Sequence, residues 1–203
     1  MKIVIFAVAA FGLLIPAYAS AELSYNAVQI GYAKTTESGE ADINEFDLGV
    51  SYSINKNIYI QGLFATGNQA SGTPAGDITF TGWDVGLGAH TPIGNNVDIV
   101  GIFDLVQAKA ELGSNSQSGN GYGISVGVRG EFTPQLEGTF FGDYSSVTAN
   151  SSTTTSTGIS AGLGYYFTPQ FQLGVDIGST SYSPDIGSSY STQTIGFVGR
   201  FFY

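Results

Sequence analysis

Residues 157–182, TGISAGLGYYFTPQFQLGVDIGSTSY, decide the fold. Apolar and small residues alternate up to the turn Thr168-Pro169-Gln170, and the same two-residue period resumes after it. One face collects Ile159, Ala161, Leu163, Tyr165, Phe167, Phe171, Leu173, Val175 and Ile177. A period of two indicates a β-strand with two unlike faces. Proline presets the backbone for a turn and is poorly tolerated inside a strand. The stretch is therefore predicted to be a β-hairpin.

The same hairpin recurs along the chain. Short turns lie at residues 55–57, 91–96, 133–135 and 168–170, and their centres at 56, 93, 134 and 169 are 37, 41 and 35 residues apart. Longer loops rich in Ser, Thr, Gly and Asn lie between them, at residues 34–42, 68–77, 112–120, 149–156 and 183–189. Such a period indicates a repeated supersecondary unit. Four turns and five loops predict ten strands, at residues 24–33, 43–54, 58–67, 78–90, 97–111, 121–132, 136–148, 157–167, 171–182 and 190–203.

Composition excludes several classes of protein. Only 11% of the 203 residues are charged, against roughly 25% in an average soluble domain. Sixteen Asp and Glu against six Lys and Arg give a net charge of −10, which argues against a nucleic-acid partner, because such a partner needs a basic face. The absence of cysteine excludes a disulfide scaffold and a thiol nucleophile. After residue 20 no apolar run approaches the length of about 18 residues that a membrane-spanning helix needs.

The first 21 residues have the pattern of a secretory signal peptide. Lys2 precedes an uncharged apolar run at residues 3–15, and Pro16 ends it. Small residues then define a cleavage site after Ala19 or Ala21. We therefore expect a signal peptide at residues 1–21 and a single exported domain at residues 22–203.

Two architectures produce alternating strands: a soluble barrel or sandwich with its apolar face inward, and a transmembrane barrel with its apolar face toward lipid. The polar face here carries Gly and Ser rather than the Lys and Glu of solvated strands. Short turns gather at one end and longer loops at the other, as in membrane barrels. Aromatic residues also cluster near the short turns, and we assign to an interfacial girdle Tyr52, Phe132, Tyr165, Phe167 and Phe171. These features favour an all-β, ten-stranded antiparallel transmembrane barrel.

With these features, the C-terminal run IGFVGRFFY at residues 195–203 resembles that of the small outer-membrane β-barrel proteins of Gram-negative bacteria, which include OmpA-type and porin-like single-domain barrels. The resemblance implies an integral outer-membrane protein in contact with the lipid bilayer and lipopolysaccharide. It also implies that the barrel-assembly machinery recognises a signal at Ile195, Phe197, Phe201 and Tyr203. An even strand number places both termini on the periplasmic side. Eight strands are the alternative, although they would need hairpins of about 45 residues and much longer loops.

The alternation assigns ten charged side chains to the lumen, because an Arg or Lys facing lipid at the bilayer midplane costs about 2–4 kcal/mol. They are Glu45, Asp47, Asp84, Asp104, Arg129, Glu131, Glu137, Asp143, Asp176 and Arg200. We expect Arg129 and Arg200 to pair with several of the acids, since unpaired buried charge is costly. The lumen is then either plugged by this network or a narrow channel lined by acids. The register of residues 97–111 is ambiguous, because Asp98 and Asp104 share a face with Val100 and Ile102.

The sequence shows little sign of catalytic chemistry. His90, the single histidine, lies at the short-turn end, and the letters Gly-x-Ser-x-Gly at residues 123–127 fall inside an alternating strand rather than at a strand-to-helix turn. We expect no enzyme activity, no metal site and no cofactor. The first functional hypothesis is a structural or surface-interaction role in adhesion or envelope integrity, with a surface ligand that the sequence does not identify. The alternative is a narrow, cation-preferring channel for ions or small solutes.

Overall fold

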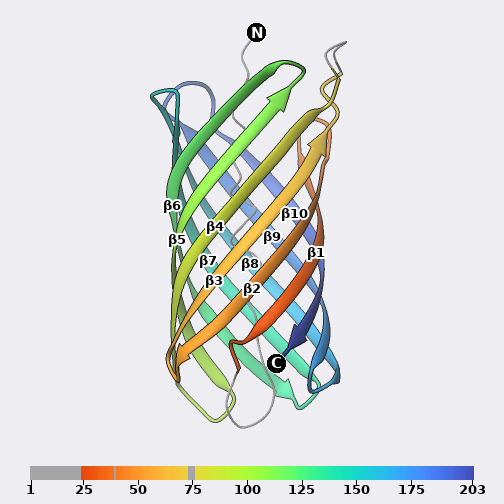
Figure 1. The fold of residues 1–203 in the computed structure, drawn as a ribbon, viewed down its shortest axis with the longest axis vertical. Helices are drawn as coiled ribbons and strands as arrows, with labels where there is room; N and C mark the ends of the chain where they lie inside the picture. The colour runs from red at the N-terminus through yellow and green to blue at the C-terminus, as the bar shows by residue number, and fades with distance from the viewer. Residues whose placement is uncertain (1–23, 39, 73–75) are drawn as a thin grey trace.

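The computed structural model describes residues 24–38, 40–72 and 76–203, and the expected signal peptide at residues 1–21 lies outside them. The described residues form ten strands: β1 (Ala27–Glu37), β2 (Ile43–Asn55), β3 (Ile58–Gln69), β4 (Ile78–Pro92), β5 (Val97–Leu112), β6 (Asn115–Thr133), β7 (Leu136–Ala149), β8 (Ser152–Thr168), β9 (Phe171–Pro184) and β10 (Tyr190–Phe202). Each strand pairs with its neighbours in chain order, and β1 pairs with β10, so the sheet closes (Figure 1). The predicted ten-stranded antiparallel barrel is confirmed. No helix in the described part of the chain is long and apolar enough to cross a membrane.

The register of the strands sets their tilt. Phe202 on β10 pairs with Ala27, and the pairs then run around the barrel through all the other strands until they return to β10 at Tyr190. The stagger is therefore twelve residues, 202 minus 190. A barrel with such a stagger has strands inclined by roughly 35–45° to its axis. Figure 1 shows that the strands are tilted relative to the long axis of the barrel. We call the end that carries the four short turns and the start of β1 the turn end, and the opposite end the loop end.

Two of the five loop predictions are wrong. The loops expected at residues 112–120 and 149–156 are two-residue turns, at residues 113–114 and 150–151, and β6 and β8 are correspondingly longer than predicted. Gly113, Asn150 and Ser151 have φ values of 60°, 49° and 66°, and positive φ is what tight hairpin turns of the primed types require. The extra strand residues are mostly Ser, Thr, Asn and Gln, so they lack the apolar alternation that identifies a strand in sequence, but they still complete the backbone ladder.

The outward face of the barrel is apolar over most of its height. Large aliphatic side chains such as Ile30 and Leu105 are 63% and 57% exposed, which is the opposite of the burial expected in a water-soluble domain. Such a continuous exposed apolar surface indicates contact with lipid. The residues of the predicted assembly signal, Ile195, Phe197, Phe201 and Tyr203, are all exposed at outward positions.

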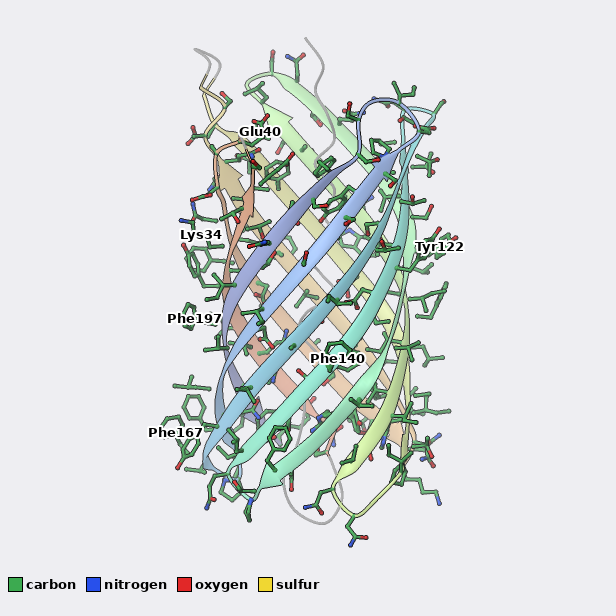
Figure 2. The ribbon with its side chains drawn as sticks, turned by 180° about the vertical axis from the view of Figure 1, so that it is seen from behind. Lys34, Glu40, Tyr122, Phe140, Phe167 and Phe197 are labelled. Carbon is green, nitrogen blue, oxygen red and sulfur yellow. The ribbon has the colours of Figure 1, made fainter. Side chains whose placement is uncertain are left out.

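Two rows of aromatic side chains border this apolar face. The five predicted girdle residues, Tyr52, Phe132, Tyr165, Phe167 and Phe171, are all exposed near the turn end. A second row, which we call the upper aromatic row, lies toward the loop end and consists of Tyr32, Phe46, Phe64, Trp83, Tyr122 and Tyr144. Figure 2 shows Phe167 and Tyr122 at these two levels. Two aromatic belts that flank an apolar band are typical of outer-membrane barrels.

Beyond the upper aromatic row the outer wall becomes polar. Hydroxyl groups pair across neighbouring strands: Thr148 with Thr153 at 2.9 Å, and Ser181 with Ser191 at 3.0 Å. A tilted strand needs only about 9–11 residues to cross the hydrocarbon layer, whereas β8 has 17. The strands therefore continue past the apolar band as a hydroxyl-rich collar, which we define by Thr148, Thr153, Thr155, Ser181, Ser183 and Ser191.

A glycine in β6 permits close approach to β7. A side chain at Gly127 would overlap the carbonyl oxygen of Phe140 and the ring of Phe141. We expect Gly127→Ala to lower the free energy of unfolding by about 1–3 kcal/mol, the usual cost of overpacking. The measurement is urea unfolding in lipid vesicles, followed by the fluorescence of Trp83. Gly101→Ala is the matched control, because nothing lies within 4 Å of its added methyl group. Equal unfolding midpoints for the two variants would contradict the expectation.

Candidate functional site: the barrel lumen

The register places all ten predicted charged residues at inward positions, and it also resolves the ambiguous strand. They are Glu45, Asp47, Asp84, Asp104, Arg129, Glu131, Glu137, Asp143, Asp176 and Arg200. On β5 the inward face contains Asp98 and Asp104 together with Val100 and Ile102. The two apolar side chains belong to a small hydrophobic cluster with Tyr59, which explains why this face reads as apolar in sequence.

Five aspartates lie at nearly one level of the lumen, and we call them the aspartate row: Asp47, Asp84, Asp104, Asp143 and Asp176. Their alignment follows from the register. Asp104 pairs with Gly86, whose next inward neighbour on β4 is Asp84. Asp104 also pairs with Gly123, which pairs with Ser145, and the next inward neighbour of Ser145 is Asp143. The row therefore brings together carboxylates from β2, β4, β5, β7 and β9.

Lumen glycines make room for these carboxylates, as the sequence suggested. Three aspartates lie across a glycine of the neighbouring strand, where an added methyl group would overlap the carboxylate: Asp47 over Gly31, Asp104 over Gly86, and Asp176 over Gly162. A larger residue at any of these glycines would push the carboxylate toward the barrel axis. The glycines of the inward face therefore leave the space that these three carboxylates occupy.

The aspartate row has few partners. Gln61 donates to Asp104 at 3.0 Å, and Ser160 donates to Asp143 at 3.5 Å. Among the described residues, no Lys, Arg or His lies within 4.0 Å of a carboxylate of the row. One buried carboxylate oxygen of each of Asp47, Asp84, Asp143 and Asp176 has no hydrogen-bond partner. The row therefore gathers five carboxyl groups that form no ion pair with a described cationic side chain.

The lower lumen holds a second group, which we call the basal cluster: Tyr25, Tyr59, His90, Asp98, Arg129 and Glu137. The ring of Tyr25 stacks on Tyr59 with centroids 4.5 Å apart and on His90 with centroids 3.9 Å apart. The Tyr25 hydroxyl donates to Asp98 at 2.9 Å, and Nδ1 of His90 lies 2.7 Å from the same carboxylate oxygen. Three aromatic rings and a carboxylate thus meet at the turn end of the lumen.

The basal cluster also contains an ion pair. Arg129 lies 4.8 Å from the ring centroid of Tyr25 and forms an ion pair with Glu137 at 3.2 Å. Tyr166 donates to the same carboxylate at 2.7 Å. Arg200, which we expected to pair with acids, donates instead to Gln172 at 2.9 Å. The two arginines thus lie below the aspartate row, because their strand positions are nearer the turn end.

Sequence reasoning missed Tyr25 and Tyr59. Tyr25 precedes β1, and its neighbour Asn26 fixes this segment against β2, because the side-chain oxygen Oδ1 of Asn26 accepts the backbone N–H of Ser53 at 2.7 Å. The first predicted strand, at residues 24–33, included Tyr25, but no lumen role was assigned to this residue, because an uncharged tyrosine can lie on either face of a membrane barrel. Tyr59 did have a periodic signal. It lies between the outward Ile58 and Ile60 on β3, so its inward position could have been inferred from alternation.

Comparison with known proteins supports the fold. No protein-family model matches the sequence, and no curated protein matches it. An outer membrane channel from Pseudomonas putida F1 is similar in structure, with 11% identity over 93% of this chain and 97% of that chain, and a TM-score of 0.54. The β domain of the Bordetella autotransporter BrkA is also similar, with 11% identity over 87% of this chain and 98% of that chain, and a TM-score of 0.53.

The chain therefore has the fold of the outer-membrane β-barrels. Within that class it is a ten-stranded barrel whose lumen combines a row of five aspartates with an aromatic and ionic cluster at the turn end.

Proposed function

We propose that the protein is a non-enzymatic channel of the bacterial outer membrane that prefers small cations. The observation that carries this proposal is the aspartate row, whose five carboxylates lack a cationic partner within ion-pair distance among the described residues. Rings of Asp or Glu select cations in other pores, because they attract the permeating ion and repel anions.

Further features support the location and the absence of catalysis. The apolar outer face between two aromatic rows suits a bilayer, and in this proposal the lipids are those of the outer membrane, lipopolysaccharide included. The turn end, with the start of β1 and the C-terminal residues, faces the periplasm, and the outward C-terminal residues serve the barrel-assembly machinery. His90 is held by Asp98 and Tyr25 within the basal cluster rather than presented to a substrate.

A structural or surface-interaction role is the second candidate. The basal cluster favours it, since a stacked and hydrogen-bonded group at the turn end narrows the path through the lumen. The collar would then be the contact surface. At its edge the Ser152 hydroxyl and the Thr153 backbone hold Asp185 and keep the pKa of that carboxyl below its usual value.

Planar-bilayer recording of the refolded mature protein tests the proposal. We expect stable current steps whose reversal potential in a KCl gradient shows a preference for K⁺. Asp84→Asn combined with Asp104→Asn should reduce the permeability ratio of K⁺ to Cl⁻ several-fold, because two adjacent charges leave the row. Asp185→Asn is the matched control, since it removes an acid exposed outside the lumen.

Two results would overturn the channel. One is an equal change of the K⁺ to Cl⁻ permeability ratio in the double variant, Asp84→Asn with Asp104→Asn, and in the control, Asp185→Asn. The other is a barrel that is folded, as shown by its heat-dependent gel mobility, but silent in the bilayer both as the wild type and after the basal cluster is opened. The second result would favour the structural role.

A further inference from the structure

The longest gap in the upper aromatic row spans three adjacent strands. The six members of the row lie on β1, β2, β3, β4, β6 and β7; β5 contributes none, and neither do β8, β9 and β10. The outward Phe197 on β10 pairs with Tyr32 but lies lower on the tilted wall, below the level of Tyr122 (Figure 2). At the corresponding level these three strands present Ile159, Ile177 and Ile195. The next outward residues toward the loop end are Thr157, Ser179 and Gln193. The wall therefore lacks bulky interfacial side chains over a continuous sector.

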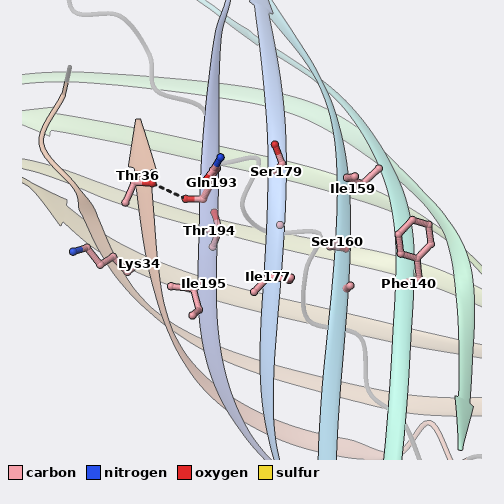
Figure 3. A pocket seen from close by; sticks show the side chains of 12 residues that line it. Lys34, Thr36, Phe140, Ile159, Ser160, Ile177, Ser179, Gln193, Thr194 and Ile195 are labelled. Carbon is pink, nitrogen blue, oxygen red and sulfur yellow. Dashed lines mark hydrogen bonds between the residues drawn. The ribbon is translucent and has the colours of Figure 1, made fainter. Parts of the chain in front are cut away.

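A groove of about 470 Å³ occupies this sector. Figure 3 shows its lining side chains on five consecutive strands of the wall, from Lys34 and Thr36 on β1 to Phe140 on β7. The groove is amphipathic along the barrel axis. Its part nearer the middle of the barrel is lined by isoleucines and Phe140, and its part nearer the loop end is lined by Lys34, Ser179 and Gln193.

The charge at the polar end is a lysine with spare donors. Nζ of Lys34 lies 2.6 Å from Asp42, and the lysine side chain is 45% exposed. An ammonium group has three donors, so the contact with Asp42 leaves others for a second acceptor. The apolar part of the groove belongs to the lipid-facing wall, so a ligand that fills the whole groove must itself lie partly in the bilayer.

We propose that this groove is a binding site for a single membrane lipid with a phosphorylated headgroup. One acyl chain lies against the isoleucines of β8, β9 and β10, and the phosphate accepts hydrogen bonds from Lys34 at the level where the aromatic row is missing. The polar end of the groove lies toward the loop end, so the lipid belongs to the leaflet on that side. This site does not depend on whether the lumen conducts.

Native mass spectrometry of the refolded mature protein tests the site by counting bound lipids. The probe is a defined phosphatidic acid, and the diacylglycerol with the same chains is its phosphate-free counterpart. We expect one phosphatidic acid to be retained after detergent exchange. Ser179→Phe, which fills the groove with an aromatic ring of the kind found elsewhere in the row, should abolish this retention. Lys34→Gln should weaken it about two- to five-fold, the usual range for an exposed ion pair, and leave diacylglycerol binding unchanged.

Lys109→Gln is the matched control. Lys109 lies 2.7 Å from Glu111 and is 44% exposed, so it resembles Lys34 in pairing and exposure, but it lies on β5, away from the groove. The proposal is overturned if Lys34→Gln and Lys109→Gln weaken retention equally, because the effect would then be general surface charge. It is also overturned if folded Ser179→Phe retains the lipid as the wild type does, or if the wild type retains none.

Discussion

Tyr25→Ala is expected to raise the single-channel conductance of the refolded barrel several-fold. Tyr25 is the centre of the basal cluster, since it stacks on two rings, donates to Asp98 and lies beneath the Arg129 guanidinium. Its removal takes a large buried side chain out of the turn end of the lumen and leaves the aspartate row in place. The strands are held by the closed ladder of backbone pairs, so the barrel should persist. The measurement is the distribution of current steps in a planar bilayer.

Tyr25→Phe separates the two contributions of this residue. It keeps the ring and loses only the hydrogen bond to Asp98, so its conductance should stay near that of the wild type. Cation preference should survive in Tyr25→Ala, because the row that confers it lies above the cluster. A conductance that is the same in all three proteins would show that Tyr25 does not restrict the path. A large conductance in Tyr25→Phe would assign the closure to the hydrogen bond instead of the ring.

The aspartate row could be predicted from the sequence, whereas the basal cluster could not. Alternation predicted the ten strands and the inward position of the aspartates, because a strand has a fixed period of two and lipid does not tolerate charge. It did not predict the collar. Where the outer face of a strand meets water, Ser and Thr can occupy both faces, and the sequence then shows no alternation of apolar and polar residues. Nor did it predict the basal cluster, which depends on a contact between Tyr25 and Asp98, 73 residues apart in the chain.

The partner of each arginine was likewise beyond sequence reasoning. Arg129 and Arg200 both point inward, as alternation required, yet one meets a carboxylate and the other an amide. The difference arises from the stagger of the barrel, which sets which residues of distant strands share a level. The sequence therefore predicted that acidic side chains outnumber basic ones in the lumen, but it did not predict the partner of each arginine.

Arg129→Met is expected to be the most destabilising single substitution in the basal cluster. Arg129 is fully buried, and Glu137, its partner at 3.2 Å, is 1% exposed. Removing one member of a buried ion pair leaves the other charge uncompensated and costs about 3–5 kcal/mol. The free energy of unfolding in lipid vesicles, measured by urea titration with Trp83 fluorescence, should fall by that amount.

Two further variants show whether charge is the cause. Arg200→Met should cost less, because Arg200 donates to the neutral Gln172. Adding Glu137→Gln to Arg129→Met should recover part of the loss, since the amide can still accept from Tyr166 and no longer leaves a charge buried. A double variant that is no more stable than Arg129→Met would show that the guanidinium acts through its packing on Tyr25 rather than through Glu137, and the closure of the turn end would then be aromatic rather than ionic.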